Sequence, residues 1–222
     1  MFPAEPTGWS EMQKYTTSTT FTAPEDGWFK FIGVAKSGEG GSSNTWSDSS
    51  DTYRRGGGGG GAGGIVVSVF ALHQGEAVTL SFGFGVNIEA QGQNANAQTG
   101  SNGRNASTGD SGGRGGSGGS ATGGNLLNKP GQAGDTGGFA IDLGEGGSGG
   151  INTYEGYSTR GGTGLPSNNR KPTPSYSYIV VLRGNTNLTQ TQLNAMDITT
   201  LMLDNSRLEQ EVTGIMLSQS AQ

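Results

Sequence analysis

The sequence predicts a mainly β protein, in which a β-sandwich carries glycine-rich, polyglycine II-like segments and is followed by a C-terminal helix. Three observations support this fold class. Six consecutive glycines, Gly56–Gly61, are followed by Ala62-Gly63-Gly64 and then by the apolar run Ile65–Phe70, as expected of a folded β body and not of a tail. Further along the chain, glycine recurs at every third position. Near the C-terminus, apolar residues recur at alternating spacings of three and four.

Composition limits the size of the core and the classes of function. The chain has 222 residues, of which 44 are glycine, and only 30% are hydrophobic, so the core must be small and concentrated. Seven prolines are too few for collagen. The net charge of −5 offers no basic face for nucleic acid. With no cysteine, disulfides and zinc–thiolate sites are excluded.

The β body is expected to contain two hairpins and a closing strand. Residues 18–23 and 28–36 are predicted to pair across the turn Pro24–Gly27, where proline fixes φ and glycine tolerates positive φ. The apolar residues of the return strand exceed simple alternation, so both of its faces are expected to be covered. A second hairpin is predicted from Ile65–Leu72, the turn at 73–76, and a strand that starts at Ala77 and continues to Val86.

The remaining parts of the chain have less regular patterns. Residues 1–17 are expected to form an irregular N-terminal arm, in which Phe2, Trp9 and Met12 supply apolar anchors. Residues 37–55 are predicted to be a polar loop, and residues 176–182 to be the strand that closes the domain at 18–183.

The segment from about 91 to 164 is nearly free of apolar residues and has glycine triplets. A period of three matches the polyglycine II helix, which lacks internal hydrogen bonds and must pair with neighbouring segments. We therefore expect these runs to pack as a slab, with Gly56–Gly61 at the joint between slab and sandwich. A flexible glycine–serine linker is the alternative, although a long structureless loop before a core strand is uncommon.

The C-terminal segment 184–222 is predicted to form a coiled-coil-like helix that holds copies of the chain together, most simply as a homotrimer. Its seam has a polar a-type position, where a buried amide specifies register and oligomeric state. The seam residues are Ile198, Leu201, Asn205, Leu208, Val212 and Ile215. Packing on the chain's own β body, or docking to another protein, remains open.

Catalysis has little support in the sequence. His73 is the only histidine and falls in a predicted turn, so neither a Ser-His-Asp triad nor a histidine-based metal site can be assembled elsewhere. The carboxylate pairs Asp48/Asp51 and Asp142/Glu145 are expected to be solvated, although acid–base chemistry or calcium binding is open to them. We expect no enzyme activity, no cofactor and no metal.

Two loops have a composition suited to recognition. Both combine aromatic residues with small polar ones, which gives contact area at a small entropic cost. The receptor-contact candidates are Trp46, Tyr53, Tyr154, Tyr157 and Arg160. The alternative for the tyrosines is that they cover glycine backbone.

The order of these elements resembles the glycine-rich domains of bacteriophage tail-fibre and tail-associated proteins. The resemblance rests on the turn after Phe21-Thr22-Ala23, the glycine run, the Gly75-Glu76 turn, the strand that ends in Phe82-Gly83-Phe84-Gly85, the glycine triplets and the final Tyr-Ile-Val-Val strand. A similar order occurs in the glycine-rich domain of the anaplastic lymphoma kinase receptor, which implies a jelly-roll-like sandwich with polyglycine II helices. The absence of cysteine argues against a eukaryotic secreted module.

The resemblance implies a virion structural protein of a phage tail, baseplate or fibre that contributes to host attachment by non-catalytic binding. Its partners are then other copies of itself, other virion proteins and a glycan or protein of the bacterial surface. Because no signal peptide or membrane-spanning stretch is recognisable, synthesis in the host cytoplasm and no membrane insertion are expected. A capsid or collar decoration protein is the leading alternative, and a polysaccharide-degrading tailspike is a third.

Overall fold

The computed structural model describes residue 2 and residues 5–47, 52–107, 112–141, 146–164 and 176–185. The chain divides into two compact units, Met1–Gly184 and Asn185–Gln222. The six predicted seam positions, from Ile198 to Ile215, lie outside the described residues.

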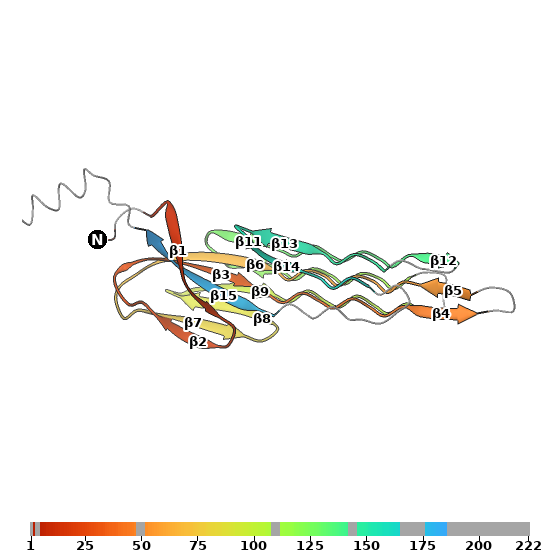
Figure 1. Ribbon diagram of the computed structural model, residues 1–222. Helices are drawn as coiled ribbons and strands as arrows, with labels where there is room; N and C mark the ends of the chain where they lie inside the picture. The colour runs from red at the N-terminus through yellow and green to blue at the C-terminus, as the bar shows by residue number, and fades with distance from the viewer. Residues whose placement is uncertain are drawn as a thin grey trace, which may run out of the picture. The chain divides into compact units, whose positions relative to one another are not determined.

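The first unit is built from antiparallel β-sheets, and the predicted mainly β class is confirmed (Figure 1). One five-stranded sheet has the order β1 (Gly8–Tyr15), β15 (Tyr178–Asn185), β3 (Gly27–Val34), β6 (Ile65–Leu72) and β11 (Leu127–Lys129). The second has the order β10 (Ala121–Thr122), β9 (Gln93–Gln98), β8 (Gly85–Ala90), β7 (Ala77–Phe82) and β2 (Thr19–Thr22). A small sheet joins β12 (Phe139–Ile141), β5 (Thr52–Arg55) and β4 (Asn44–Ser47), and a hairpin joins β13 (Ile151–Tyr154) to β14 (Tyr157–Arg160).

The main core lies between the two five-stranded sheets. Phenylalanines form its centre: the ring of Phe31 lies 5.4 Å from that of Phe21 and 5.8 Å from that of Phe70, both in edge-to-face geometry. Aliphatic residues such as Leu80 and Ile88 line the facing sheet and are fully buried. The scarce apolar residues are thus concentrated where two sheet faces meet, as the composition required.

The outer face of the first sheet is covered as well. The hairpin β13–β14 and the side chain of Trp9 pack over a second buried cluster on β3, β6 and β15. This cluster consists of Ile32, Val34, Ile65, Val67, Val180 and Leu182. The expectation that the strand at 28–36 is covered on both faces is confirmed, and it explains why its apolar residues do not alternate.

Both predicted hairpins are wrong. Strand β2 pairs with β7 in the second sheet, whereas β3 pairs with β15 and β6 in the first. The turns at 24–27 and 73–76 therefore carry the chain from one sheet to the other. Turn residues specify a reversal of the chain, but they do not specify whether the two strands share a sheet.

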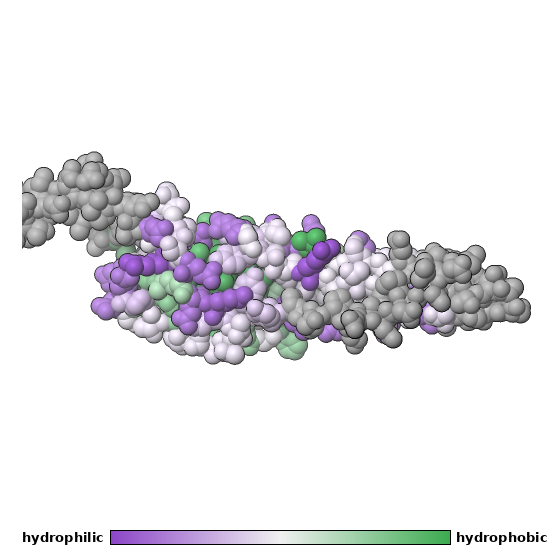
Figure 2. All heavy atoms as spheres, in the orientation of Figure 1, coloured by the Kyte–Doolittle hydropathy of each residue, from purple (hydrophilic) through white to green (hydrophobic). Residues whose placement is uncertain are grey.

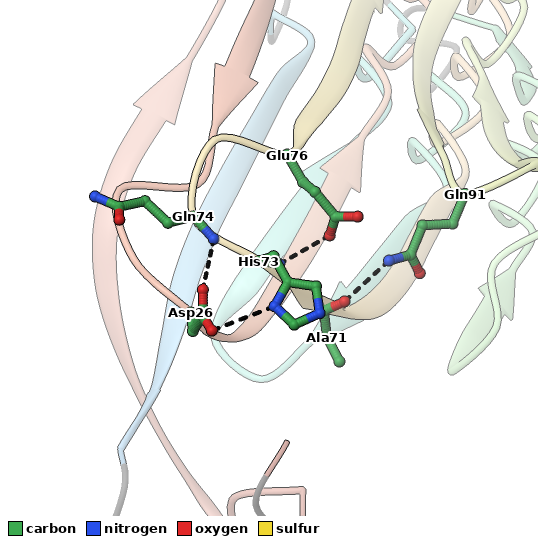
Figure 3. Close-up of polar contacts among 6 residues, drawn as sticks. All are labelled: Asp26, Ala71, His73, Gln74, Glu76 and Gln91. Carbon is green, nitrogen blue, oxygen red and sulfur yellow. Dashed lines mark hydrogen bonds and ion pairs between the residues drawn. The ribbon is translucent and has the colours of Figure 1, made fainter. Parts of the chain in front are cut away.

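Hydrogen bonds join these two crossover turns to each other (Figure 3). The Asp26 carboxylate accepts a bond of 2.7 Å from the amide of Gln74 and lies 3.2 Å from Nδ1 of His73. These contacts lower the pKa of Asp26 below its ordinary value. The hydrogen bond from the Gln74 amide contributes most, and the contact with His73 contributes next. The His73 side chain is exposed, as the turn position predicted.

Other expectations need correction. Residues 8–15 form strand β1 and not an irregular arm; Trp9 packs against the body, but Met12 is exposed. The strand that begins at Ala77 ends at Phe82 and reverses into β8.

The predicted polar loop at 37–55 contains β4 and β5. Residues 93–98 are strand β9, whose Ala95 and Ala97 belong to the main core. Sequence patterns missed β9 because its buried residues are only alanines.

Candidate binding surface

Seven glycine-rich segments pack together into what we call the glycine bundle. They are residues 35–43, 56–64, 99–107, 112–120, 130–138, 146–150 and 161–164. Each is continuous with a strand. The segments 35–43, 99–107, 130–138 and 161–164 follow β3, β9, β11 and β14, respectively, and the segments 56–64, 112–120 and 146–150 precede β6, β10 and β13. The strands therefore fix the starting position of every segment, and Figure 1 shows the segments running side by side away from the sheets.

The segment 56–64 lies at the centre of the bundle. It is hydrogen-bonded to each of the six others, and the pairing repeats at every third residue. Gly58 and Gly61 donate to carbonyl oxygens of 99–107 at 3.0 Å, whereas Gly56, Gly59 and Ala62 donate to carbonyl oxygens of 130–138 at 2.8 to 2.9 Å. A repeat of three residues is that of a polyglycine II helix. The nine residues then span about 28 Å at roughly 3.1 Å each.

The six outer segments also bond to one another and close a ring around the central one. Their order is 35–43, 99–107, 112–120, 130–138, 146–150 and 161–164. The bonds that join neighbours include Gly100 to Lys36, Arg104 to Arg114, Gly134 to Gly116, Asp135 to Ser148, Gly164 to Gly147 and Gly162 to Gly38, each from amide to carbonyl at 2.8 to 3.0 Å. The expected slab is thus a closed bundle, and the glycine run is its axis and not a joint.

Close backbone contact explains why the axis is glycine. Every residue from Arg55 to Phe70 is buried. A Cβ atom on Gly61 would overlap the carbonyl oxygen of Ser117, and one on Gly60 would overlap that of Gly38. Since the bundle buries few apolar groups, its backbone hydrogen bonds, each worth about 1 kcal/mol net, and its attachment to the sheets must hold it together.

Most residues of the bundle other than glycine are exposed, whereas Ala35, Ser37 and Ala62 are buried. Exposed side chains of this kind are Asn102, Asn105, Arg114, Ser117, Ser120, Gln132, Asp135, Ser148 and Thr163. Some of them also complete the hydrogen bonding: Oδ1 of Asn102 accepts from the amide of Glu39, and Oδ1 of Asn105 from that of Ser42, both at 2.8 Å. The bundle therefore offers a rigid surface of small polar and amide side chains, and its described atoms are mostly pale in Figure 2, between hydrophilic and hydrophobic.

The first pair of receptor-contact candidates lies at the end of the bundle that is farther from the sandwich. Trp46 and Tyr53 are paired residues of β4 and β5, the strands that precede the axis. The buried guanidinium of Arg55 donates a bond of 2.9 Å to the carbonyl oxygen of Ser107 and so ties this end to the segment 99–107.

The second group of candidates lies at the opposite end, against the sandwich. Tyr154 and Tyr157 are paired residues of the hairpin β13–β14 and pack on the second core cluster. Oη of Tyr157 donates a bond of 2.9 Å to Glu11. Arg160 is exposed at the other end of the hairpin, where it pairs with Ile151. The two candidate groups are therefore separated by the length of the axis. The tyrosines cover apolar strands here, and not the glycine backbone that the sequence suggested as the alternative.

The surroundings of these two tyrosines favour their neutral forms. Burial, followed by contact with Glu155, raises the pKa of Tyr154 to about 12. Burial, followed by the hydrogen bond to Glu11, raises the pKa of Tyr157 to about 12. Both hydroxyls therefore act as hydrogen-bond donors at neutral pH.

Two polar residues that anchor the hairpin were missed by the sequence reasoning. The side-chain nitrogen of buried Asn152 donates to the carbonyl oxygens of Gly63 and Lys129, at 3.0 and 2.9 Å. Buried Lys30 forms an ion pair of 3.2 Å with Glu155 and lies 4.8 Å above the ring of Trp9. No local pattern marks either residue, because their partners come from distant parts of the chain.

No group of three potential metal-ligating side chains occurs among the described residues, and none of their segments is a helix long and apolar enough to cross a bilayer. The carboxylate pairs Asp48/Asp51 and Asp142/Glu145 lie outside the described residues.

Comparison with known proteins gives no relative from which to transfer a function. No protein-family model matches the chain, and no curated protein matches it significantly. The function must therefore be argued from the geometry alone.

Proposed function

We propose that the protein is a structural component of a bacteriophage virion, in the tail, baseplate or fibre, and that it contributes to host attachment by non-catalytic binding. In this proposal the sandwich is jelly-roll-like, and the part of the segment 184–222 that follows β15 forms the helix that joins copies of the chain. The observation that carries the proposal is the closed seven-segment bundle, which is a rigid rod with a polar surface.

The path of the chain supports an orientation for the rod. Strand β3 runs toward the bundle and continues into it after Val34. Strand β15 is antiparallel to β3, and its Arg183 pairs with Phe29 near the start of β3. The chain therefore passes Gly184 at the end of the sandwich that faces away from the bundle, where Gly184 also contacts Pro6.

This orientation separates an attachment end from a contact end. Strand β15 ends on the side of the sandwich away from the bundle, which suits attachment of the protein, or joining of its copies, through the segment that comes next in the sequence. The small sheet β12–β5–β4 then lies at the opposite end, where a host surface would be met first. Tight backbone pairing makes the rod stiff, so contact residues at its end are held at a small entropic cost.

The location of the protein tests the proposal. Virions are labelled with a gold-conjugated antibody to this chain and imaged by electron microscopy, with virions that lack the protein as the control. Label on the tail, baseplate or fibre is expected. Label over the capsid or collar would overturn the proposal in favour of a decoration protein. Release of oligosaccharides from purified host envelope would instead favour a polysaccharide-degrading tailspike.

A further inference from the structure

The second sheet has a pocket on its surface beside the start of the glycine bundle. It has a volume of 240 Å³ and lies at the turn between β7 and β8. Its lining includes Ser81, Phe82, Phe84, Asn87, Asn96 and Gln98. Gly83 and Gly85 flank Phe84 and have no side chains to fill this space. The pocket is smaller than those that hold drug-sized ligands.

Phe84 is the most exposed large apolar side chain among the described residues, at 94% of its full accessible area. Its backbone is nevertheless held in place, because its carbonyl oxygen accepts a bond of 2.9 Å from the amide of Thr99. A bond of 3.2 Å from the amide of Gly83 to the carbonyl oxygen of Gly85 closes the turn. A ring presented in this way offers an open face for stacking at little entropic cost.

The polar residues of the pocket form a row across three strands. Ser81 is paired with Asn87, and Asn87 with Asn96, so their side chains lie on the same outward face of the sheet. Gln98 lies two residues along from Asn96, on the same face. This row provides hydroxyl and carboxamide groups that both donate and accept hydrogen bonds.

One of these groups lacks a hydrogen-bond partner within the described part of the chain. Oδ1 of Asn87 is buried and accepts no hydrogen bond. An unsatisfied buried acceptor of this kind costs about 1 to 3 kcal/mol. Asn87 lines the pocket, so a ligand hydroxyl bound there could donate to this oxygen after a rotation of the carboxamide.

The lining residues named here have no ionisable side chain, which favours a neutral ligand. From this combination we propose that the pocket binds one ring of a neutral sugar. The apolar C–H face of the ring stacks on Phe84, and its hydroxyls bond to Asn87, Asn96 and Gln98. The site is separate from the far end of the bundle, and it does not rest on the function proposed above.

Free monosaccharides test this proposal on the isolated full-length chain. Isotope-labelled protein is titrated with the methyl α-glycosides of glucose, galactose and mannose and with N-acetylglucosamine, and the side-chain amide signals of Asn87, Asn96 and Gln98 are followed by NMR. Saturable shifts with a dissociation constant of about 1 mM, or −4.1 kcal/mol, are expected for at least one sugar. Phe84→Ala and Asn96→Ala should each weaken binding at least tenfold.

Leu126→Ala is the matched control, because it removes an exposed apolar side chain elsewhere on the surface. The affinity of this variant for the sugars should equal that of the wild type. Absence of saturable shifts with all four sugars would overturn the proposal, as would unchanged affinity in Phe84→Ala. Binding of benzyl alcohol without binding of any sugar would also overturn it, since the site would then be a simple apolar pocket. Since the titrations use no virions, these results leave the proposed function untouched.

Discussion

Gly58 lies so close to Arg114 that no side chain fits between their backbones. A Cβ atom on Gly58 would overlap the carbonyl oxygen of Arg114, which belongs to an outer segment of the bundle. Gly58→Val should therefore force the axis and that segment apart. We expect a loss of about 2 kcal/mol or more, which is typical of overpacking, together with faster hydrogen exchange at the amides of Gly59 and Gly61.

Gly83→Val is the control for this substitution, because a Cβ atom on Gly83 meets nothing within 4 Å. Thermal denaturation and amide exchange of both variants would be compared with those of the wild type. Equal midpoints for the two variants would contradict close packing of the axis.

The ion pair between Lys30 and Glu155 predicts an asymmetry between its two partners. The Lys30 side chain is 5% exposed and that of Glu155 is 51% exposed. Glu155→Gln leaves a buried ammonium group without its opposite charge, whereas Lys30→Met removes the charge and retains the apolar stem. With the exposure of Glu155 taken into account, we expect Glu155→Gln to cost about 1 kcal/mol more than Lys30→Met.

Chemical denaturation of the two single variants and the double variant measures this difference. The double variant should be no less stable than Lys30→Met. If Glu155→Gln were as stable as the wild type, the buried ammonium would not depend on this carboxylate.

The raised pKa of Tyr157 predicts a loss of stability at alkaline pH. Its folded-state value of about 12 lies above the ordinary value of 10.0, so the folded chain holds the proton more tightly than the unfolded chain does. The stabilisation is complete below pH 10 and is lost as the pH rises from about 10 to about 12. Tyr154 should contribute in the same direction.

Tyr157→Phe removes this proton and should flatten the alkaline fall in the denaturation midpoint, while costing some stability at neutral pH through loss of the bond to Glu11. Tyr176→Phe alters an exposed tyrosine and serves as the control. The denaturation midpoint of the wild type would be measured from pH 9 to pH 12, in buffers about one pH unit apart. A midpoint that did not change over this range would show that ionisation of Tyr157 is not linked to folding.

The proposed orientation predicts where host contact occurs. A virion that carries Trp46→Ala with Tyr53→Ala should adsorb to host cells about tenfold more weakly, as expected when interface anchors are lost. Contact through Tyr154 and Tyr157 stays a separate prediction, because both are partly buried and their truncation also removes packing.

The pair Tyr154→Phe and Tyr157→Phe retains most of that packing and is the comparison. If adsorption fell for virions with the phenylalanine pair, and not for virions with Trp46→Ala and Tyr53→Ala, host contact would lie at the sandwich end.

The C-terminal segment is tested by truncation. Sedimentation of the full-length chain should show a trimer, and a chain that ends before Asp197 should sediment as a monomer. A monomer in both cases would contradict the predicted seam from Ile198 to Ile215, and a trimer in both would place the contact elsewhere.

Sequence patterns located five of the ten strands of the two large sheets, namely β2, β3, β6, β7 and β15, but not their pairing. The apolar runs predicted at 28–36 and 65–72 form β3, which ends at Val34, and β6, because their residues favour a pleated, buried surface. Their partners depend on crossovers at Asp26 and His73, whose contacts join positions far apart in the chain. Local turn chemistry contains no information on such contacts.

The same limit applies to the candidate binding surface. The glycine triplets predicted threefold geometry, which the hydrogen bonds of the bundle show. They predicted packed backbone at Gly56–Gly61 but placed it at a joint and not at the axis, because a glycine run does not show which segments will surround it. The pocket beside Phe84 was missed because its polar row forms only when β7, β8 and β9 are aligned.

The threefold repeat of the bundle restricts how its length can change. Each central residue faces the same neighbour again only after three positions, so one inserted residue in 56–64 would rotate every later amide away from its acceptor. Three inserted residues would restore the match and extend the axis by about 9 Å, provided that the outer segments gained the same increment. The length of the rod can therefore change only in steps of three residues. Related proteins with longer or shorter rods should differ by whole turns, and in all seven segments together.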